Sequence, residues 1–200
     1  MLNRCLSAVM AGMLISIGCC AYASVENRVV GALLFSLGLM SVVIYRLMLY
    51  TGKVGCLGKG FSTKDLAIMF ACNGLGCAAF CAIASMAGLP CLQQLEAIAT
   101  AKLAARPWHQ VMAAAVICGM LMEIGVASWR EDREAHAAKS FITIAAVMAF
   151  ILTGAEHSVA NFFYVLFGHG TIAGTCLFIA LCFIGNGIGG VLANRLLSRL

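Results

Sequence analysis

Long apolar segments dominate this chain and constrain its fold more than any other feature. An α-helix needs about 20 residues to cross the hydrocarbon core of a bilayer, and six segments of roughly that length can be drawn: 5–24, 29–50, 66–89, 108–129, 140–167 and 171–194. Only 10% of the residues are charged, against about 25% in a typical soluble domain. Unpaired backbone groups are costly in lipid, so such segments are expected to be helical. The sequence therefore predicts an all-α transmembrane protein with six spans in a single domain, residues 1–200.

The basic residues predict how the spans are oriented. With six spans, one side receives nine Lys and Arg residues and the other side three, while Arg46 falls inside the second span. The nine are Arg4, Lys53, Lys59, Lys64, Arg130, Arg133, Lys139, Arg195 and Arg199, and the three are Arg28, Lys102 and Arg106. Residues 130–134, between the fourth and fifth segments, are the most charged stretch of the chain and are predicted to be a loop. Because cytoplasmic loops carry the excess of basic residues, we expect a multi-pass protein of the cell (inner) membrane with both termini in the cytoplasm. No basic cluster is interleaved with aromatic residues, so no nucleic-acid partner is expected.

The first segment has a second interpretation. Arg4, the apolar run after it and the sequence Ala21-Tyr22-Ala23-Ser24 together resemble a signal peptide with an A-x-A cleavage site. Cleavage there would leave five spans and remove the internal symmetry described next.

The eleven cysteines lie mostly inside apolar segments, and none forms a paired C-x-x-C pattern beside histidines. We interpret them as small apolar side chains that fill helix interfaces. No metal and no cofactor is expected.

A short motif recurs in the third and sixth segments. The pattern F-x-x-N-G-[LI]-G occupies residues 70–76 and again residues 183–189, 113 residues later. Three spans separate the copies, so the second copy should cross the membrane in the opposite direction. This predicts two inverted three-helix repeats, about 1–90 and 105–200, with the solute path between them. Small-residue stretches also recur in membrane helices because they pack closely, which is the alternative explanation.

The second and fifth spans are expected to be broken helices. Residues 49–55 (Leu-Tyr-Thr-Gly-Lys-Val-Gly) and 153–158 (Thr-Gly-Ala-Glu-His-Ser) place glycines and ionisable groups at membrane depth. Irregular backbone is tolerated there only where it lines a cavity or is buried in protein. An ionisable residue inside a span is a candidate functional residue, and His157 can exchange a proton near neutral pH. A neutral histidine hydrogen-bonded within the bundle is the alternative.

Residues 154–163, Gly-Ala-Glu-His-Ser-Val-Ala-Asn-Phe-Phe, resemble the G-x-E-H-S-x-A-N motif of the formate/nitrite transporter family. The last span resembles the family's G-N-x-x-G-G sequence, with Asn186 as its asparagine, and Leu49-Tyr50-Thr51 resembles the L-F-T of the family's Ω loop. The family comprises pentameric channels with an aquaporin-like fold that carry formate, nitrite, hydrosulfide and related monovalent anions. The resemblance therefore implies an aquaporin-like homopentamer in the lipid bilayer.

The same resemblance implies a substrate pathway. Thr51 matches the gating-loop threonine, Phe35 and Leu39 fall at the family's cytoplasmic constriction, and Phe150 falls at the constriction phenylalanine of the fifth span. Lys102, in Ala99-Thr100-Ala101-Lys102, matches the lysine near the central histidine, with Arg106 as the competing match. The pathway residues so predicted are His157, Lys102, Thr51, Asn186, Phe35, Leu39, Phe150, Tyr50, Glu156 and Asn73. Phenylalanines and leucines at helical spacing are, as a class, more often core or lipid-facing residues.

The sequence also departs from the family pattern. Met48 stands where the family has a glutamate, Arg46 replaces a small residue nearby, and Gly119 follows Cys118 where an asparagine is usual. Glu123 lies about one turn beyond. Because neither charge should persist alone in the membrane, we hypothesise that Arg46 and Glu123 form an ion pair.

The function expected from these residues is passive or proton-linked passage of small monovalent anions or their neutral acids. Lys102 would draw the anion in, and His157, with Thr51 and Asn186 as hydrogen-bond partners, would relay a proton or act as a fixed donor. An intramembrane enzyme that uses His157 is one alternative, although adjacent residues on a helix such as His157 and Ser158 do not face each other. A channel for a small neutral solute is another. The interpretation favoured is a channel and not an enzyme.

Overall fold

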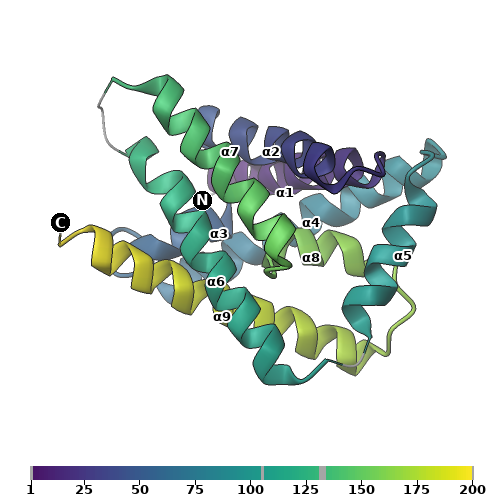
Figure 1. Ribbon diagram of the computed structural model, residues 1–200. Coiled ribbons are helices and arrows are strands. Elements are labelled where there is room, and N and C mark those ends of the chain that lie inside the picture. Colours follow the sequence, from purple (N-terminus) through teal and green to yellow (C-terminus); the bar gives the residue numbers. More distant parts are fainter. Residues whose placement is uncertain (1, 105, 131–133, 200) are drawn as a thin grey trace.

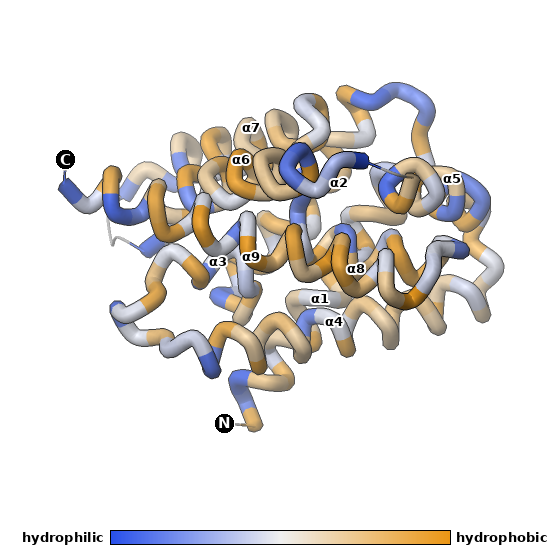
Figure 2. Tube along the Cα trace, turned by 90° about the horizontal axis from the view of Figure 1, so that it is seen from below, coloured by the Kyte–Doolittle hydropathy of each residue, from blue (hydrophilic) through white to orange (hydrophobic). Residues whose placement is uncertain are grey.

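The computed structural model describes residues 2–104, 106–130 and 134–199, and in these ranges the protein is a bundle of helices without strands (Figure 1). The elements are α1 (Leu2–Ala23), α2 (Arg28–Ile44), α3 (Tyr50–Lys53), the 3₁₀ turn η1 (Val54–Cys56), α4 (Thr63–Met86), α5 (Leu92–Leu103), α6 (Trp108–Ala127), the 3₁₀ turn η2 (Ser128–Arg130), α7 (His136–Thr153), α8 (Ser158–Val165) and α9 (Ile172–Leu197). The long helices run along the bundle. The α5 helix closes one end, and both chain termini lie toward the other end (Figures 1 and 2).

Within the described residues, five helical segments are long and apolar enough to cross a membrane: α1, α4, α6 with η2, α7 and α9. The second predicted span forms the shorter α2, which has 17 residues. Large apolar side chains are exposed on these helices, for example Leu37 on α2, Leu75 on α4 and Leu177 on α9. In Figure 2, hydrophobic residues (orange) recur along these helices. The all-helical membrane architecture predicted from the sequence is therefore confirmed, with five helices that reach the length of a span by themselves.

Local sequence signals set several helix ends. Asn27 caps α2 by accepting from the backbone N–H groups of Val29 and Val30. Ser62 and Asp65 form a reciprocal capping box at the start of α4, which satisfies two helix-terminal N–H groups. At the other end of α7, Gly154 adopts φ 75°, the left-handed conformation in which glycine commonly ends a helix. The charged stretch predicted as a loop at 130–134 begins where η2 ends, and its residues 131–133, including Arg133, lie outside the described residues.

The chain is interrupted within the second and fifth predicted spans. After α2 ends at Ile44, the backbone is non-helical until α3 begins at Tyr50, so this break starts earlier than the expected residues 49–55. The fifth segment divides into α7 and α8, separated by residues 154–157, where the sequence predicted a break. Each break leaves backbone N–H and C=O groups without helical partners inside the bundle.

Two buried asparagines satisfy these groups in the same manner. Asn73 on α4 accepts from the N–H of Tyr50 and donates to the carbonyl oxygens of Met48 and Ala8. Asn186 on α9 accepts from the N–H of Ser158 and donates to the carbonyl oxygens of Glu156 and Ala115.

Asn73 therefore ties the first break to α1 and α4, whereas Asn186 ties the second break to α6 and α9. All six bonds measure between 2.8 and 2.9 Å.

Glycines let the helices approach closely beside each asparagine. A Cβ atom at Gly12 of α1 would lie 2.0 Å from the carbonyl oxygen of Asn73, and one at Gly119 of α6 would lie 2.3 Å from that of Asn186. The family pattern has asparagine after this cysteine, whereas this chain has Gly119. The close contact explains the glycine, because no side chain fits at position 119.

We expect Gly119→Ala to destabilise the protein by about 2 kcal/mol, because overpacking of a tight contact costs about 1–3 kcal/mol. The methyl group would force α6 away from α9. Thermal unfolding of the purified protein in detergent measures the effect. Ala113→Ser, which adds one atom at an exposed position of the same helix, is the control. An equal change in both variants would contradict this account of the helix contact.

Candidate functional site

His157 lies at the second break, as the N-cap residue of α8. Its Nδ1 accepts a hydrogen bond from the N–H of Ala160 at 3.1 Å, and its Nε2 lies 2.9 Å from the hydroxyl oxygen of Thr51. A backbone N–H is only a donor, so Nδ1 carries no proton. The ring is therefore the Nε2–H tautomer and donates to Thr51. This bond joins α3 of the first break to the second break.

Aromatic rings stack next to this histidine. The rings of Phe150 and His157 stack with centroids 5.4 Å apart, and Phe35 meets Phe150 edge to face at 5.5 Å. Phe35 and Phe150 are both buried. The structure thus brings together three of the predicted pathway residues into one aromatic stack, in which the Nε2–H of His157 is the polar donor.

Glu156, the neighbour of His157, holds two cations. Its carboxylate lies 2.6 Å from the Nζ of Lys102 and 2.6 Å from Nη1 of Arg106, and it accepts from the amide of Asn161 at 2.8 Å. The carboxylate is buried, whereas the two basic side chains are partly exposed. Two positive charges against one negative charge leave a local excess of +1, which favours an anion at this end of the bundle.

A cavity of about 180 Å³ lies between these groups. His157, Phe35, Phe150 and Lys102 line it, together with Arg28 and Asn161. Lys102, rather than Arg106, therefore shares a cavity with His157. Arg106 lines a neighbouring cavity, which it shares with Lys102.

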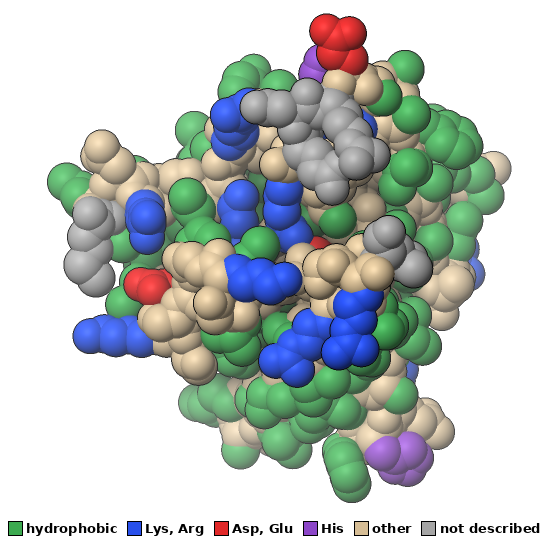
Figure 3. All heavy atoms as spheres, turned by 90° about the vertical axis from the view of Figure 1, so that its left-hand side faces the viewer, with side chains coloured by type: hydrophobic (Ala, Val, Ile, Leu, Met, Phe, Trp, Pro, Cys, Tyr) green, Lys and Arg blue, Asp and Glu red, His purple; other side chains and the backbone are tan. Residues whose placement is uncertain are grey.

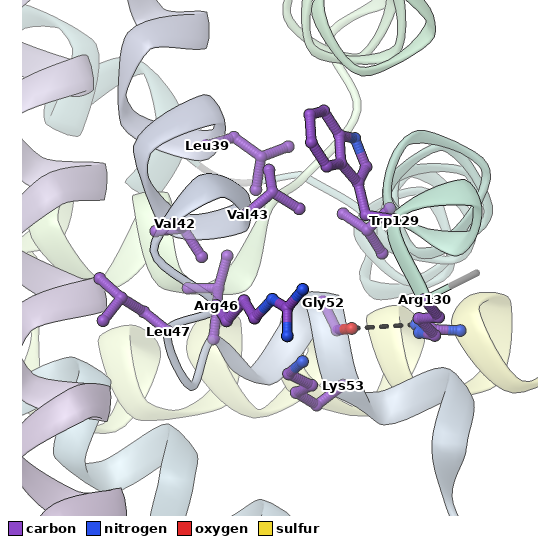
Figure 4. A pocket seen from close by; sticks show the side chains of 11 residues that line it. Leu39, Val42, Val43, Arg46, Leu47, Gly52, Lys53, Trp129 and Arg130 are labelled. Atoms are coloured by element: carbon purple, nitrogen blue, oxygen red, sulfur yellow. Dashed lines mark hydrogen bonds between the residues drawn. The ribbon is translucent and has the colours of Figure 1, made fainter. Parts of the chain in front are cut away.

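A second, larger cavity of about 400 Å³ is present near α3 (Figure 4). Leu39 and Leu49 line it, with Gly52 of α3 and the basic residues Arg46, Lys53 and Arg130. Phe35 and Leu39, one helical turn apart on α2, thus line different cavities. Leu49 was not among the predicted pathway residues, although it directly precedes Tyr50 and Thr51 in the quoted motif.

The hypothesis of an Arg46–Glu123 ion pair is wrong. Glu123 is fully buried and pairs with Arg130, at 2.5 and 2.8 Å to its two carboxylate oxygens, and it accepts from Asn194 at 2.7 Å. Arg130 follows Glu123 by seven residues, or two helical turns, which places both on one face of the α6–η2 segment. Because Arg130 falls in a stretch predicted to be a loop, the sequence does not reveal it as the partner of Glu123.

Three other predicted pathway residues have structural roles. Asn73 and Asn186 hold the two breaks, and Asn186 makes no hydrogen bond to His157, contrary to expectation. The hydroxyl of Tyr50 donates to the carbonyl oxygen of Phe183 at 2.8 Å, and the two rings stack. None of these three side chains lines either of the two cavities.

Comparison with known proteins agrees with this arrangement. The family model described as "Formate/nitrite transporter" matches residues 1–199. The chain belongs to this family. A solved structure titled "FNT family ion channel" is 25% identical, with a TM-score of 0.82, over 99% of this chain and 89% of the other. A second formate/nitrite transporter fold, titled "Pentameric formate channel with formate bound", gives a TM-score of 0.76 at 21% identity, over 99% of this chain and 94% of the other. A search of curated protein sequences gives no significant match.

Glu156 in this family member provides a test of the charge arrangement. Lys102→Met and Arg106→Met each leave the carboxylate one cation, so each should cost little stability. The double variant leaves a buried carboxylate without a cation, which typically costs 3–5 kcal/mol. We expect its loss in thermal stability to exceed the sum of the single losses. Adding Glu156→Gln to the double variant should restore much of the stability, and simple additivity would contradict the account.

Proposed function

We propose that the protein is a channel through which small monovalent anions, of the formate, nitrite and hydrosulfide class, cross the membrane with a proton as their neutral acids. The observation that carries the proposal is the Thr51–His157 hydrogen bond. His157 lines the cavity of Phe35 and Phe150, and Thr51 lies between Leu49 and Gly52, which line the opposite cavity. The Nε2–H of His157 and the hydroxyl hydrogen of Thr51 thus lie where apolar side chains separate the two cavities.

The cost of charge transfer supports the neutral acid as the crossing species. An unpaired ion that moves from water into a medium of low dielectric pays on the order of tens of kcal/mol. Phe35, Leu39 and Phe150 offer it no compensation. Lys102, Arg106 and Arg28 raise the local anion concentration beside the barrier, and the anion takes a proton from water before it leaves the cavity.

The Thr51–His157 pair then replaces part of the water that the acid loses. Nε2–H donates to the hydroxyl of Thr51, which leaves the hydroxyl hydrogen free to donate to an oxygen or sulfur of the substrate. A proton relay through His157 would add a proton at Nδ1 and release one from Nε2, so it requires the bond from Ala160 to break. The donor role requires no such change, and we therefore favour it over the relay.

The proposal extends to the architecture of the channel. We propose two inverted repeats, about 1–90 and 105–200, in which α1, α2, α3 and α4 correspond to α6, α7, α8 and α9. The matching bonds of Asn73 and Asn186 support this, as do the matching close contacts of Gly12 and Gly119. In this arrangement the six spans are completed by the broken pairs α2–α3 and α7–α8.

We further propose a homopentamer with both termini in the cytoplasm, in the cell inner membrane. One solved structure of this fold is titled as a pentameric formate channel. The exposed apolar side chains of the bundle provide surface both for subunit contacts and for lipid. Lys and Arg side chains gather on the end of the molecule shown in Figure 3, which fits a cytoplasmic face.

Formate uptake into proteoliposomes tests the function. We expect flux to rise as pH falls, because the neutral fraction of a weak acid increases about tenfold per unit of pH well above its pKa. A channel for neutral solutes would carry glycerol or urea but show no formate flux. An intramembrane enzyme would release product from a transmembrane substrate without conducting formate.

The His157→Asn variant distinguishes a role of His157 as a hydrogen-bond donor from a role as a proton relay. Asparagine is a good N-cap residue, so α8 keeps its cap while the Nε2–H donor is lost. We expect formate flux to fall by about tenfold at every pH, as for the loss of one hydrogen bond of about 1 kcal/mol or slightly more, with an unchanged slope against pH.

Thr51→Val should lower the flux to a similar extent, and Thr51→Ser, which keeps the hydroxyl, should preserve it. Disappearance of the pH slope in His157→Asn would mean that the histidine relays the proton.

A further inference from the structure

The cavity beside α3 carries three basic side chains that the pathway through Thr51 and His157 does not use. Arg46, Lys53 and Arg130 all line it, and no described residue of its lining is acidic. In Figure 4 the guanidinium of Arg46 and the ammonium of Lys53 point toward one another, beside the bond from Arg130 to the carbonyl oxygen of Gly52. Like charges that share one space repel each other, and an anion bound between these side chains would offset that repulsion.

The residues that the structure describes supply only part of this negative charge. Arg130 pairs with Glu123, but neither Arg46 nor Lys53 makes an ion pair or a hydrogen bond with its side chain within residues 2–104, 106–130 and 134–199. Among the described residues, one carboxylate therefore pairs with one of the three cations around this cavity. Within the same residues, Arg46 and Lys53 are left as two positively charged donors that could bind a ligand.

The backbone at Arg46 indicates that its position is specific. Arg46 has φ 54°, a left-handed conformation that is uncommon for residues other than glycine and asparagine. It lies just after α2, where Leu47 donates to the carbonyl oxygen of Val42 and closes the helix end. Arg46 therefore lines the cavity from a backbone conformation that is unfavourable for arginine.

We propose that this cavity is a binding site for small oxyanions, in which Arg46 and Lys53 are the main ligands and Arg130 is the third. The site rests on the proposed function in one respect, since we expect it to be the mouth of the pathway opposite Lys102. It should bind divalent oxyanions such as inorganic phosphate more tightly than monovalent ones, because two or three positive charges converge on the ligand.

A phosphate ion bound there could not continue, because it stays charged at neutral pH and the apolar side chains of Leu39 and Leu49, which line the cavity, offer its charge no compensation. Bound phosphate would therefore block the entry of a conducted anion from this face.

Binding of inorganic phosphate to the purified protein, in detergent and at low salt, tests the site independently of transport. We expect Arg46→Asn and Lys53→Gln each to weaken phosphate binding by about tenfold or more. Asparagine accepts the left-handed backbone, so Arg46→Asn should keep the thermal stability of the parent. Arg46→Lys should retain most of the binding. Lys64→Gln, which makes the same charge change at an exposed position of α4 outside the cavity, is the matched control.

Several outcomes would overturn the proposal. They are the absence of phosphate binding by the parent protein, an equal loss in Lys64→Gln and Arg46→Asn, and unchanged binding in both cavity variants.

Formate flux in the same preparations keeps the two proposals apart. Inhibition by phosphate from one face only, relieved in Arg46→Asn, supports the block, and binding without inhibition overturns it. Phosphate binding by a protein that conducts no formate would overturn the proposed function and leave the site standing.

Discussion

The structure depends on satisfying backbone groups at two places where helices break inside the bundle. Each unpaired N–H or C=O group costs several kcal/mol in hydrocarbon, so a break persists only where the protein provides partners. Asn73 and Asn186 provide them, each with one acceptor and two donors used in full. The glycines beside them bring the neighbouring helices within reach. The two amides hold in place the segments that carry Thr51 and His157, although the ring nitrogens of His157 pair with Thr51 and Ala160 instead.

Much of this was readable in the sequence. Apolar segment lengths predicted the helices, and the recurrence of N-G-[LI]-G identified both asparagines. The glycines and ionisable residues at 153–158 located the second break, and the family motif pointed to His157 and Thr51. These signals depend on residues close together in the chain, so a single sequence is enough to recognise them. The first break was predicted too late, because nothing in Tyr45-Arg46-Leu47 breaks a helix by composition, and a left-handed arginine is set by its packing.

Side-chain partners were harder to predict. Arg46 and Glu123 were paired on the argument that neither charge persists alone, but Arg130, expected in a loop, reaches the buried carboxylate instead. Asn186 was expected at His157 and supports the backbone beside it. Both errors arise because a sequence states which polar groups need partners but not the directions in which their side chains leave the helices. One turn of α2 separates Phe35 from Leu39, so that they line the two cavities on opposite sides of a thin barrier.

That barrier has an electrical consequence. Four residues of helix rise about 6 Å, so roughly this distance separates the side chains that face one cavity from those that face the other. Both cavities are large enough for water, and a membrane voltage falls mainly across the dry part of its path. The field between Phe35 and Leu39 is then about five times that across a uniform hydrocarbon layer about 30 Å thick. An anion would experience almost the whole voltage in a single step, whereas a neutral acid would not sense it, so transport in the proposed neutral form would be independent of membrane potential.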